Sequence, residues 1–236
     1  MSTTPSNWSS AATALATTGA RATSVWDRLD AQELRRRASH MAPGLLPFIL
    51  WGIPHRDPLS TTAQVIFVAI FVALTAVLFL QWSRISRSGV GSGDRIAAIY
   101  GYACSVLLTL LLFPAHAECG LAVLGVLAFG DGSATFFGKL FGGPRLLWNP
   151  NKSIAGFLGF LCVGLPVTAL IYWGESNNLE AIGPPATMSQ AALVAAAGVV
   201  AGAFAETIES RVNDNVRVGL ASAFAIVSAH ALLFGL

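Results

Sequence analysis

The stretch SIAGFLGFLCVGLPVTALIYWG, residues 153–174, contains no charged side chain in 22 residues. A helix needs roughly 20 mainly apolar residues to cross the hydrocarbon core of a bilayer, so this run predicts a transmembrane helix. The chain has further apolar runs at 61–82, 96–113, 117–130, 189–205 and 218–236, and a shorter one at 41–53. Together they predict an all-α fold, a polytopic membrane helix bundle with about seven transmembrane helices. The run at 117–130 is short, and we expect it to continue past Asp131 as a helix partly buried in protein.

The composition excludes an ordinary soluble domain. Of the 236 residues, 54% are hydrophobic and 11% are charged, whereas a soluble domain of this size carries about 25% charged residues. The polar remainder is too small for a separate soluble catalytic domain, so any chemistry is expected at the membrane surface. The net charge of +2 gives no reason to expect a nucleic-acid partner. The three cysteines lack the spacing and the His/Cys clustering of a zinc site.

The lysines and arginines are placed asymmetrically along the chain. If all seven apolar runs cross the membrane, 13 of the 14 cationic side chains fall on one side, and only Arg56 falls on the other. The positive-inside rule then makes the N-terminus and the loops 83–95, 131–152 and 206–217 cytoplasmic. We therefore divide the chain into a cytoplasmic leader with an amphipathic helix at 1–40 and a membrane-embedded domain at 41–236. A re-entrant 41–53 segment is the alternative, but it would move five arginines to the outside.

Two cytoplasmic segments, 130–156 and 206–217, are predicted to be catalytic loops. Asp131 ends one apolar run, and Glu206 follows another long run without charge. A carboxylate at the lipid end of a helix is costly unless it is used or paired. Asp214 follows in the second segment, beside an asparagine, and both offer the hard oxygen donors that Mg²⁺ prefers.

The first segment also has the features of a phosphate site. It contains Lys139, Arg145 and Lys152, and we expect it to return to the membrane at a helix N-terminus near Ser153. Cations and the positive end of a helix dipole both favour bound phosphate. The alternative is that the carboxylates of the two segments only cap helices and pair with Lys152, Arg211 or Arg217.

Several short runs resemble motifs of the phytol kinase and dolichol kinase family. They are Gly130-Asp131-Gly132 and Asn149-Pro150-Asn151-Lys152-Ser153-Ile154-Ala155-Gly156. Asp214-Asn215 after Glu206 is similar to that family's second motif, and Arg35-Arg36-Arg37-Ala38-Ser39-His40 followed by Gly44 is similar to its N-terminal feature. The likeness covers roughly residues 35–236.

The resemblance implies a membrane kinase that transfers the γ-phosphate of CTP, or another nucleoside triphosphate, to a lipid alcohol such as phytol or polyprenol. It implies that Asp131, Lys152, Glu206 and Asp214 are catalytic, with Asp131 and Asp214 as ligands of Mg²⁺. The residues that it implies for nucleotide or phosphate binding are Gly130, Gly132, Asn149, Lys152, Ser153, Gly156 and Asn215. Arg37 and His40 are further candidates to contact substrate or phosphate. Ile154 departs from the aromatic residue that relatives often carry after the Lys-Ser pair.

Two other functions stay open from the sequence. CDP-diacylglycerol synthases share a comparable membrane architecture, so the chain could be a cytidylyltransferase, although their fuller C-terminal signature is not evident. A non-enzymatic transporter or scaffold is the second alternative, disfavoured by the lack of an internal repeat. Gly198 and Gly202, in GxxxG spacing, predict close helix packing and leave a homodimer open. The histidines His55, His116 and His230 are interpreted as structural.

Overall fold

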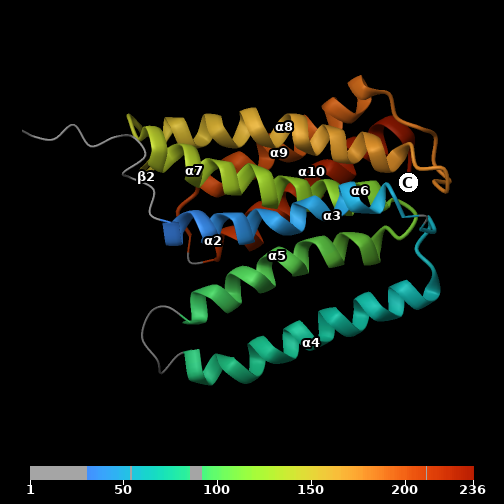
Figure 1. Cartoon of the computed structure of the whole chain (residues 1–236), viewed down its shortest axis with the longest axis horizontal. Helices are drawn as coiled ribbons and strands as arrows, with labels where there is room; N and C mark the ends of the chain where they lie inside the picture. The colour runs from blue at the N-terminus through green and yellow to red at the C-terminus, as the bar shows by residue number, and fades with distance from the viewer. Residues whose placement is uncertain (1–30, 54, 86–91, 211) are drawn as a thin grey trace, which may run out of the picture.

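The computed structural model describes residues 31–53, 55–85, 92–210 and 212–236. Helices lie side by side along the long axis of the molecule, and one short β-hairpin is found at one end (Figure 1). Residues 1–30 of the leader predicted for 1–40 and the segment 86–91 lie outside the described residues.

Four helical segments of the described chain are long and apolar enough to cross a membrane. They are Ala117–Phe141 and the helices α8 (Ile154–Ser176), α9 (Met188–Thr207) and α10 (Asp214–Phe234). The helices α4 (Thr61–Ile85) and α5 (Ser92–Leu112) contribute shorter apolar stretches within the described residues. A membrane helix bundle is therefore supported, but a count of about seven spans is not confirmed.

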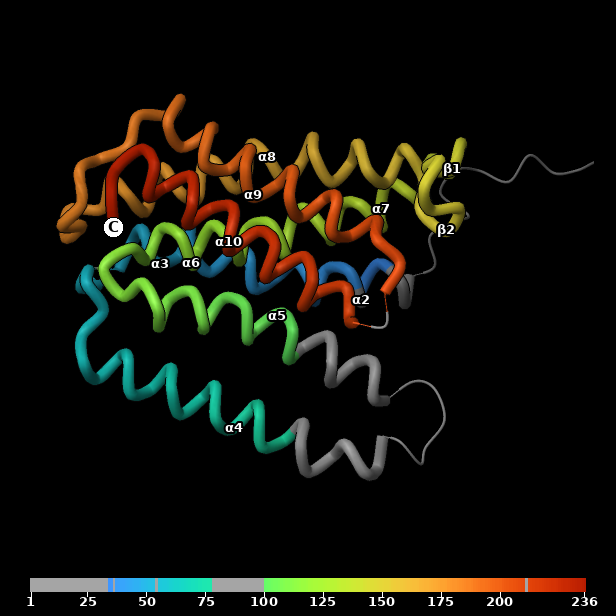
Figure 2. Tube along the Cα trace, turned by 180° about the vertical axis from the view of Figure 1, so that it is seen from behind, coloured from blue at the N-terminus to red at the C-terminus, as the bar shows by residue number. Residues whose placement is uncertain are grey.

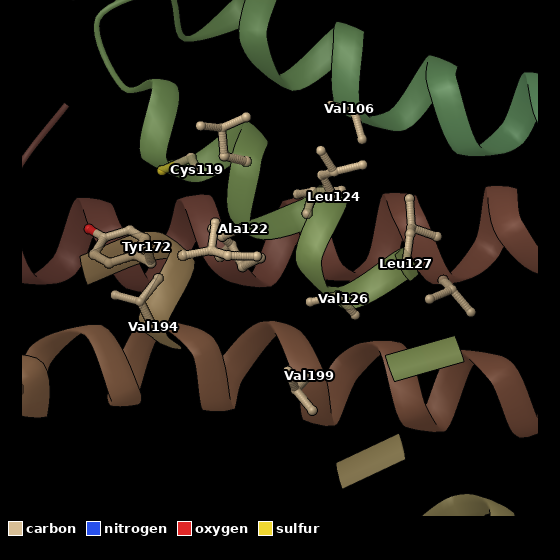
Figure 3. Packing of buried hydrophobic residues seen from close by; sticks show 14 of the residues in the cluster. Val106, Cys119, Ala122, Leu124, Val126, Leu127, Tyr172, Val194 and Val199 are labelled. Carbon is tan, nitrogen blue, oxygen red and sulfur yellow. The ribbon is translucent and has the colours of Figure 1, made fainter. Parts of the chain in front are cut away.

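The segment Ala117–Phe141 forms the centre of the bundle. It consists of α6 (Ala117–Gly125), a π-helical turn η3 (Val126–Asp131) and α7 (Gly132–Phe141). Every residue of α6 is buried, and its side chains pack with those of α8, α9 and α10 (Figure 3). The prediction that the helix continues past Asp131 and is partly buried in protein is thus confirmed. The π-turn was not predicted; such turns are frequent at functional sites.

The N-terminal helices lie along this central segment. The helix α2 (Ala31–Met41) continues through η2 (Ala42–Leu45) into α3 (Leu46–Leu50), and the three run beside α6 and α7 (Figure 1). A Cβ atom at Gly44 would lie 2.4 Å from the Cβ of Ala128, so only glycine allows this approach. The helix α2 ends at Met41, where the apolar run begins, and the chain continues from it in the same direction through η2 and α3.

The last two helices pack closely through small residues. A Cβ atom at Gly198 would lie 2.4 Å from Cγ1 of Ile226, and one at Gly202 would lie 2.6 Å from the hydroxyl of Ser222. The close packing predicted from the GxxxG spacing is thus confirmed, and its partner is α10 of the same chain. A homodimer stays a prediction.

The segment between α7 and α8 is not only a polar loop. It contains the strands β1 (Arg145–Leu146) and β2 (Asn149–Ser153), which pair antiparallel, so the fold is mostly rather than entirely helical. We call the end of the bundle that holds this hairpin and the start of α10 the hairpin end. The opposite end, which holds the starts of α4 and α6 and the ends of α3, α8 and α10, is called the far end (Figures 1 and 2).

Candidate active site at the hairpin end

Lys152 on β2 joins the two predicted catalytic segments. Its Nζ atom forms an ion pair with Oε1 of Glu206, the penultimate residue of α9, and lies 3.4 Å from Oδ2 of Asp214, the first residue of α10. The side chain of Glu206 is 9% exposed and that of Asp214 is 48% exposed. Burial of Lys152 alone would lower the pKa of its ammonium group. The attraction of the Glu206 carboxylate is stronger than this effect of burial, so the pKa of Lys152 is raised. The ammonium group therefore stays charged between two carboxylates.

Arg217 fixes Asp214 and the end of α9. Its guanidinium group pairs with Oδ1 of Asp214, and Nη1 donates to the carbonyl oxygen of Ala205 at 2.9 Å. Its Nε donates to the carbonyl of Val212 at 3.2 Å. The last carbonyl groups of a helix lack partners within the helix, and Arg217 supplies one here. The sequence indicated Arg217 as a pairing cation but not this bracing of the α9–α10 connection.

The asparagine motif ties the hairpin to the end of α9. Nδ2 of Asn149 donates to the carbonyl of Thr207 at 2.8 Å, and its Oδ1 accepts from the backbone N–H of Asn151. Nε1 of Trp148 donates to the hydroxyl of Thr207 at 3.0 Å. Because Asn149 is only 2% exposed, these contacts position the loop that carries Lys152. Its predicted contact with nucleotide stays a prediction.

The predicted helix N-terminus is present at Ser153. The Ser153 hydroxyl accepts from the backbone N–H of Gly156 and forms the N-cap of α8. A Cβ atom at Gly156 would lie 2.8 Å from the carbonyl oxygen of Ala134, so α7 and α8 approach each other closely here. The first turn of α8, with its favourable dipole end, therefore faces α7.

A cavity of about 340 Å³ opens between these elements. Its walls carry the cations Lys139 and Arg145 and the carboxylate of Glu206. The remaining lining residues are small or hydroxylated, namely Ala134, Thr135, Gly138, Gly142, Ser153 and Gly156. Two cations and a helix N-terminus in one cavity suit a ligand that carries phosphate groups.

Asp131 lies deeper in the bundle, at the end of the π-turn. Its Oδ2 atom is 3.1 Å from Nε2 of His40 on α2. The ring of Tyr102 stands edge-on to His40, with centroids 5.2 Å apart, and its buried hydroxyl has no hydrogen-bond partner. The sequence did not point to Tyr102, because a tyrosine within an apolar run has no motif of its own.

The other predicted site residues have structural surroundings. A Cβ atom at Gly130 would lie 2.6 Å from Phe160, and one at Gly132 would lie 2.6 Å from Met41, so both glycines serve helix packing. Asn215 is buried in the first turn of α10. Arg37 is buried on the same helix as His40.

The donor set of this end fits a divalent cation such as Mg²⁺. Asp131, Glu206 and Asp214 supply hard oxygens, and Oε2 of Glu206 is buried without a hydrogen-bond partner. Within the described residues these three carboxylates do not form a group whose oxygens all lie within 4.8 Å of one another, and Lys152 contacts both Glu206 and Asp214. This arrangement suits an ion held by one or two carboxylates and by substrate phosphates, as is usual for Mg²⁺.

Comparison with known proteins connects this geometry to a family. The model of the cytidylyltransferase family matches residues 7–218. Phytol kinase 1, chloroplastic, of Arabidopsis thaliana is 26% identical over 206 residues, which are 82% of this chain and 66% of that protein. The probable phytol kinase 1, chloroplastic, of Glycine max is 26% identical, with coverages of 81% and 65%.

Farnesol kinase, chloroplastic, of Arabidopsis thaliana is also similar. It is 28% identical over 209 residues, which cover 82% of this chain and 64% of that kinase. The chain thus spans slightly less than two thirds of the length of these three relatives. No solved structure matches the chain.

Proposed function

Because the chain belongs to the cytidylyltransferase family, we propose that it is a membrane lipid-alcohol kinase. It transfers the γ-phosphate of CTP, or of another nucleoside triphosphate, to an isoprenoid alcohol such as phytol or polyprenol, or to a related lipid alcohol. The phytol and farnesol kinases among its relatives support this activity. The observation that carries the proposal is the ion-paired group Lys152, Glu206 and Asp214 beside a cavity lined by cations.

The residues at this end have distinct roles in the proposed reaction. Phosphoryl transfer depends mainly on positioning the reactants and on stabilising charge. Lys139, Arg145 and the N-terminus of α8 hold the phosphates in the cavity, and Lys152 places its ammonium group at their edge. Asp131 and Asp214 are the ligands of Mg²⁺, which when bound neutralises part of the phosphate charge. The carboxylates also orient the alcohol hydroxyl and accept its proton.

The proposed orientation places this site at the cytoplasmic face of seven crossings. The first crossing is the continuous α2–η2–α3 segment, and the helical segments that follow alternate in direction along the chain (Figures 1 and 2). The start of α2 and both predicted catalytic loops then share the hairpin end. Exposed apolar side chains on α4, including Val65, Ile66 and Val72, suit a lipid-facing surface.

A labelled-nucleotide assay tests the kinase proposal. Membranes containing the protein receive Mg²⁺, CTP labelled at either the α- or the γ-phosphate, and a panel of phytol, farnesol, dolichol and diacylglycerol. We expect the γ-label in a phosphorylated alcohol and none of the α-label in lipid. Absence of a phosphorylated lipid from the whole panel, with CTP and with ATP, would contradict a lipid-alcohol kinase.

A cytidylyltransferase is the second candidate, and the description of the matching family favours it. Such an enzyme would transfer the CMP part of CTP, which carries the α-label, to a lipid phosphate and release pyrophosphate, so phosphatidic acid is added to the panel as its acceptor. The same assay therefore separates the two activities. A transporter or scaffold would give neither product.

A further inference from the structure

The far end of the bundle holds a second group of buried ionisable side chains that the proposed reaction does not use. Three carboxylates are buried there: Asp57 at 6% exposure, Glu118 at 6% and Glu175 at 1%. In the described part of the chain, the side chains that pair with Glu118 and Glu175 are histidines, whereas Lys152 pairs with Glu206 at the hairpin end. Buried carboxylates without a fixed cation are costly unless a proton or a metal ion compensates them.

One part of this group converges as metal ligands do. Ligand atoms of His116, Glu118 and His230 all lie within 4.8 Å of one another. His116 directly precedes α6, Glu118 is in its first turn, and His230 is near the end of α10. Oε1 of Glu118 is 3.4 Å from Nδ1 of His116 and 3.5 Å from Nδ1 of His230. Two ligands of one tetrahedral zinc ion, each bound at about 2.0–2.1 Å, are roughly 3.4 Å apart.

A histidine–carboxylate pair at the same end provides an internal reference. Nε2 of His55 lies 2.7 Å from Oε1 of Glu175, the length of a strong charge-assisted hydrogen bond. The contacts of Glu118 with its two histidines are longer by about the difference between a hydrogen bond and a ligand–ligand edge. The two arrangements therefore differ in distance and in number, because two imidazoles meet the Glu118 carboxylate whereas one meets that of Glu175.

The nitrogens of His230 are a second, independent observation. His230 is only 4% exposed, and its Nε2 has no hydrogen-bond partner. Its Nδ1 lies 2.6 Å from the hydroxyl of Tyr172, whose ring lies near Cys119 in the core (Figure 3). A metal-bound imidazole coordinates the ion through one nitrogen and usually donates its other N–H to an oxygen. In His230, Nδ1 faces both Glu118 and Tyr172, and Nε2 is the nitrogen left without a partner. Tyr172 competes for Nδ1, so ion binding requires this phenol to move aside.

We propose that His116, Glu118 and His230 form a binding site for a divalent transition metal of the zinc class. Two imidazoles and one carboxylate favour zinc and its neighbours over Mg²⁺, which prefers oxygen ligands throughout. His116 is partly exposed and gives the ion a route into the otherwise buried site. The ion ties the start of α6 to the end of α10 and offsets the carboxylate charge of the far end.

Metal binding is tested on the full-length protein in detergent, with any histidine tag removed and bound metal stripped by a chelator. Zinc alone is titrated and bound metal is measured by mass spectrometry, and Co²⁺ is used as a spectroscopic probe. We expect one ion per chain and the intense visible absorption of four-coordinate cobalt. The variants H116A, E118Q and H230A should each bind zinc at least tenfold more weakly, as loss of a ligand predicts.

The matched control is H55A, which removes a histidine of the same end that lies outside the trio. It should bind zinc like the wild-type protein, and Y172F should bind it equally or more tightly because a competitor for Nδ1 is gone. Wild-type protein without stoichiometric zinc and without the cobalt spectrum overturns the proposal, even if no variant folds. Equal loss in H55A and H230A overturns the assignment of the ligands. None of these readouts depends on kinase activity.

Discussion

The two ends of the helix bundle compensate buried carboxylates in different ways. At the hairpin end Glu206 and Asp214 face Lys152 and Arg217, whose charges are permanent, and a cavity opens beside them. At the far end Glu118 and Glu175 face only histidines among the described residues, and both carboxylates are buried. Fixed cations around an opening suit an anionic substrate that enters and leaves, whereas imidazoles and carboxylates in a largely buried cluster suit a resident cation.

The largest expected effect is at Lys152. Replacement by alanine removes the cation between the two segments proposed to be catalytic and leaves Glu206 buried without its partner. We expect the kcat for lipid phosphorylation to fall roughly 100- to 1000-fold, the loss typical of a preorganised group that stabilises transition-state charge. The measurement is γ-phosphate transfer at saturating CTP, with membrane insertion checked separately.

The far-end control for this variant is E118Q. It changes a carboxylate that is buried to about the same extent as Glu206, the partner of Lys152. If the two ends are functionally separate, E118Q retains most of the wild-type kcat. Near-equal losses of kcat in K152A and E118Q would mean that activity depends only on the stability of the bundle. The claim that the two ends are functionally separate would then be wrong.

The second effect is steric and concerns the floor of the cavity. In G156V the new side chain must push against the carbonyl oxygen of Ala134, which lies 2.8 Å from the ideal Cβ position. Separating α7 from α8 costs about 1–3 kcal/mol, as overpacking of a tight contact does. We expect at least a tenfold loss of kcat/KM for the nucleotide, measured at fixed lipid alcohol.

Gly183 offers the matched control, since a Cβ atom there meets nothing within 4 Å and the residue lies in the far-end connection between α8 and α9. The variant G183A should keep wild-type stability and activity. A harmless G156V would show that the nucleotide does not use the space between α7 and α8.

Whether the sequence predicts a feature of either end depends on how far apart the residues of that feature lie along the chain. The hairpin end was predictable because Asp131, Lys152 and Asp214 lie in short motifs that end or begin apolar runs. The sequence indicated His40 and Asp131 as separate candidates but not the contact between them, because that contact depends on α2 and α3 packing along the central helix.

The far-end cluster was not predictable from the sequence. Glu118 and His230 are more than a hundred positions apart, so no spacing rule for metal ligands applies to them. The number of membrane-spanning helices is hard to predict for a related reason. The segment Met41–Ile53 is too short to span alone and gains its length only by continuing from α2. Packing between distant helices, which creates both features, leaves little local signal in a chain that is apolar nearly throughout.

The third prediction concerns thermal stability. It tests the contrast between the two ends by asking which of them a bound zinc ion stabilises. Zinc at a hundredfold excess over its dissociation constant stabilises the folded state by about 2.7 kcal/mol, which raises the unfolding temperature by roughly 5–11 °C for a chain of this length. The H230A protein should show no such shift, whereas K152A should shift as the wild-type protein does. The measurement is thermal unfolding in detergent, with and without zinc. A zinc-dependent shift that persists in H230A but disappears in K152A would place the ion at the hairpin end instead.

The smallest expected effect tests whether the hairpin is held as a unit against α9. Replacing Trp148 by phenylalanine removes its hydrogen bond to the Thr207 hydroxyl but keeps an aromatic ring against Phe204. Because that hydroxyl still donates to the carbonyl of Phe204, no buried group loses its last partner, and the cost should be about 1 kcal/mol. We expect a two- to fivefold rise in KM for the nucleotide with kcat nearly unchanged, since a loosened hairpin positions Lys152 less often without altering its charge. An unchanged KM together with a lowered kcat would mean instead that the hairpin acts on the chemical step, and that the cavity is assembled independently of it.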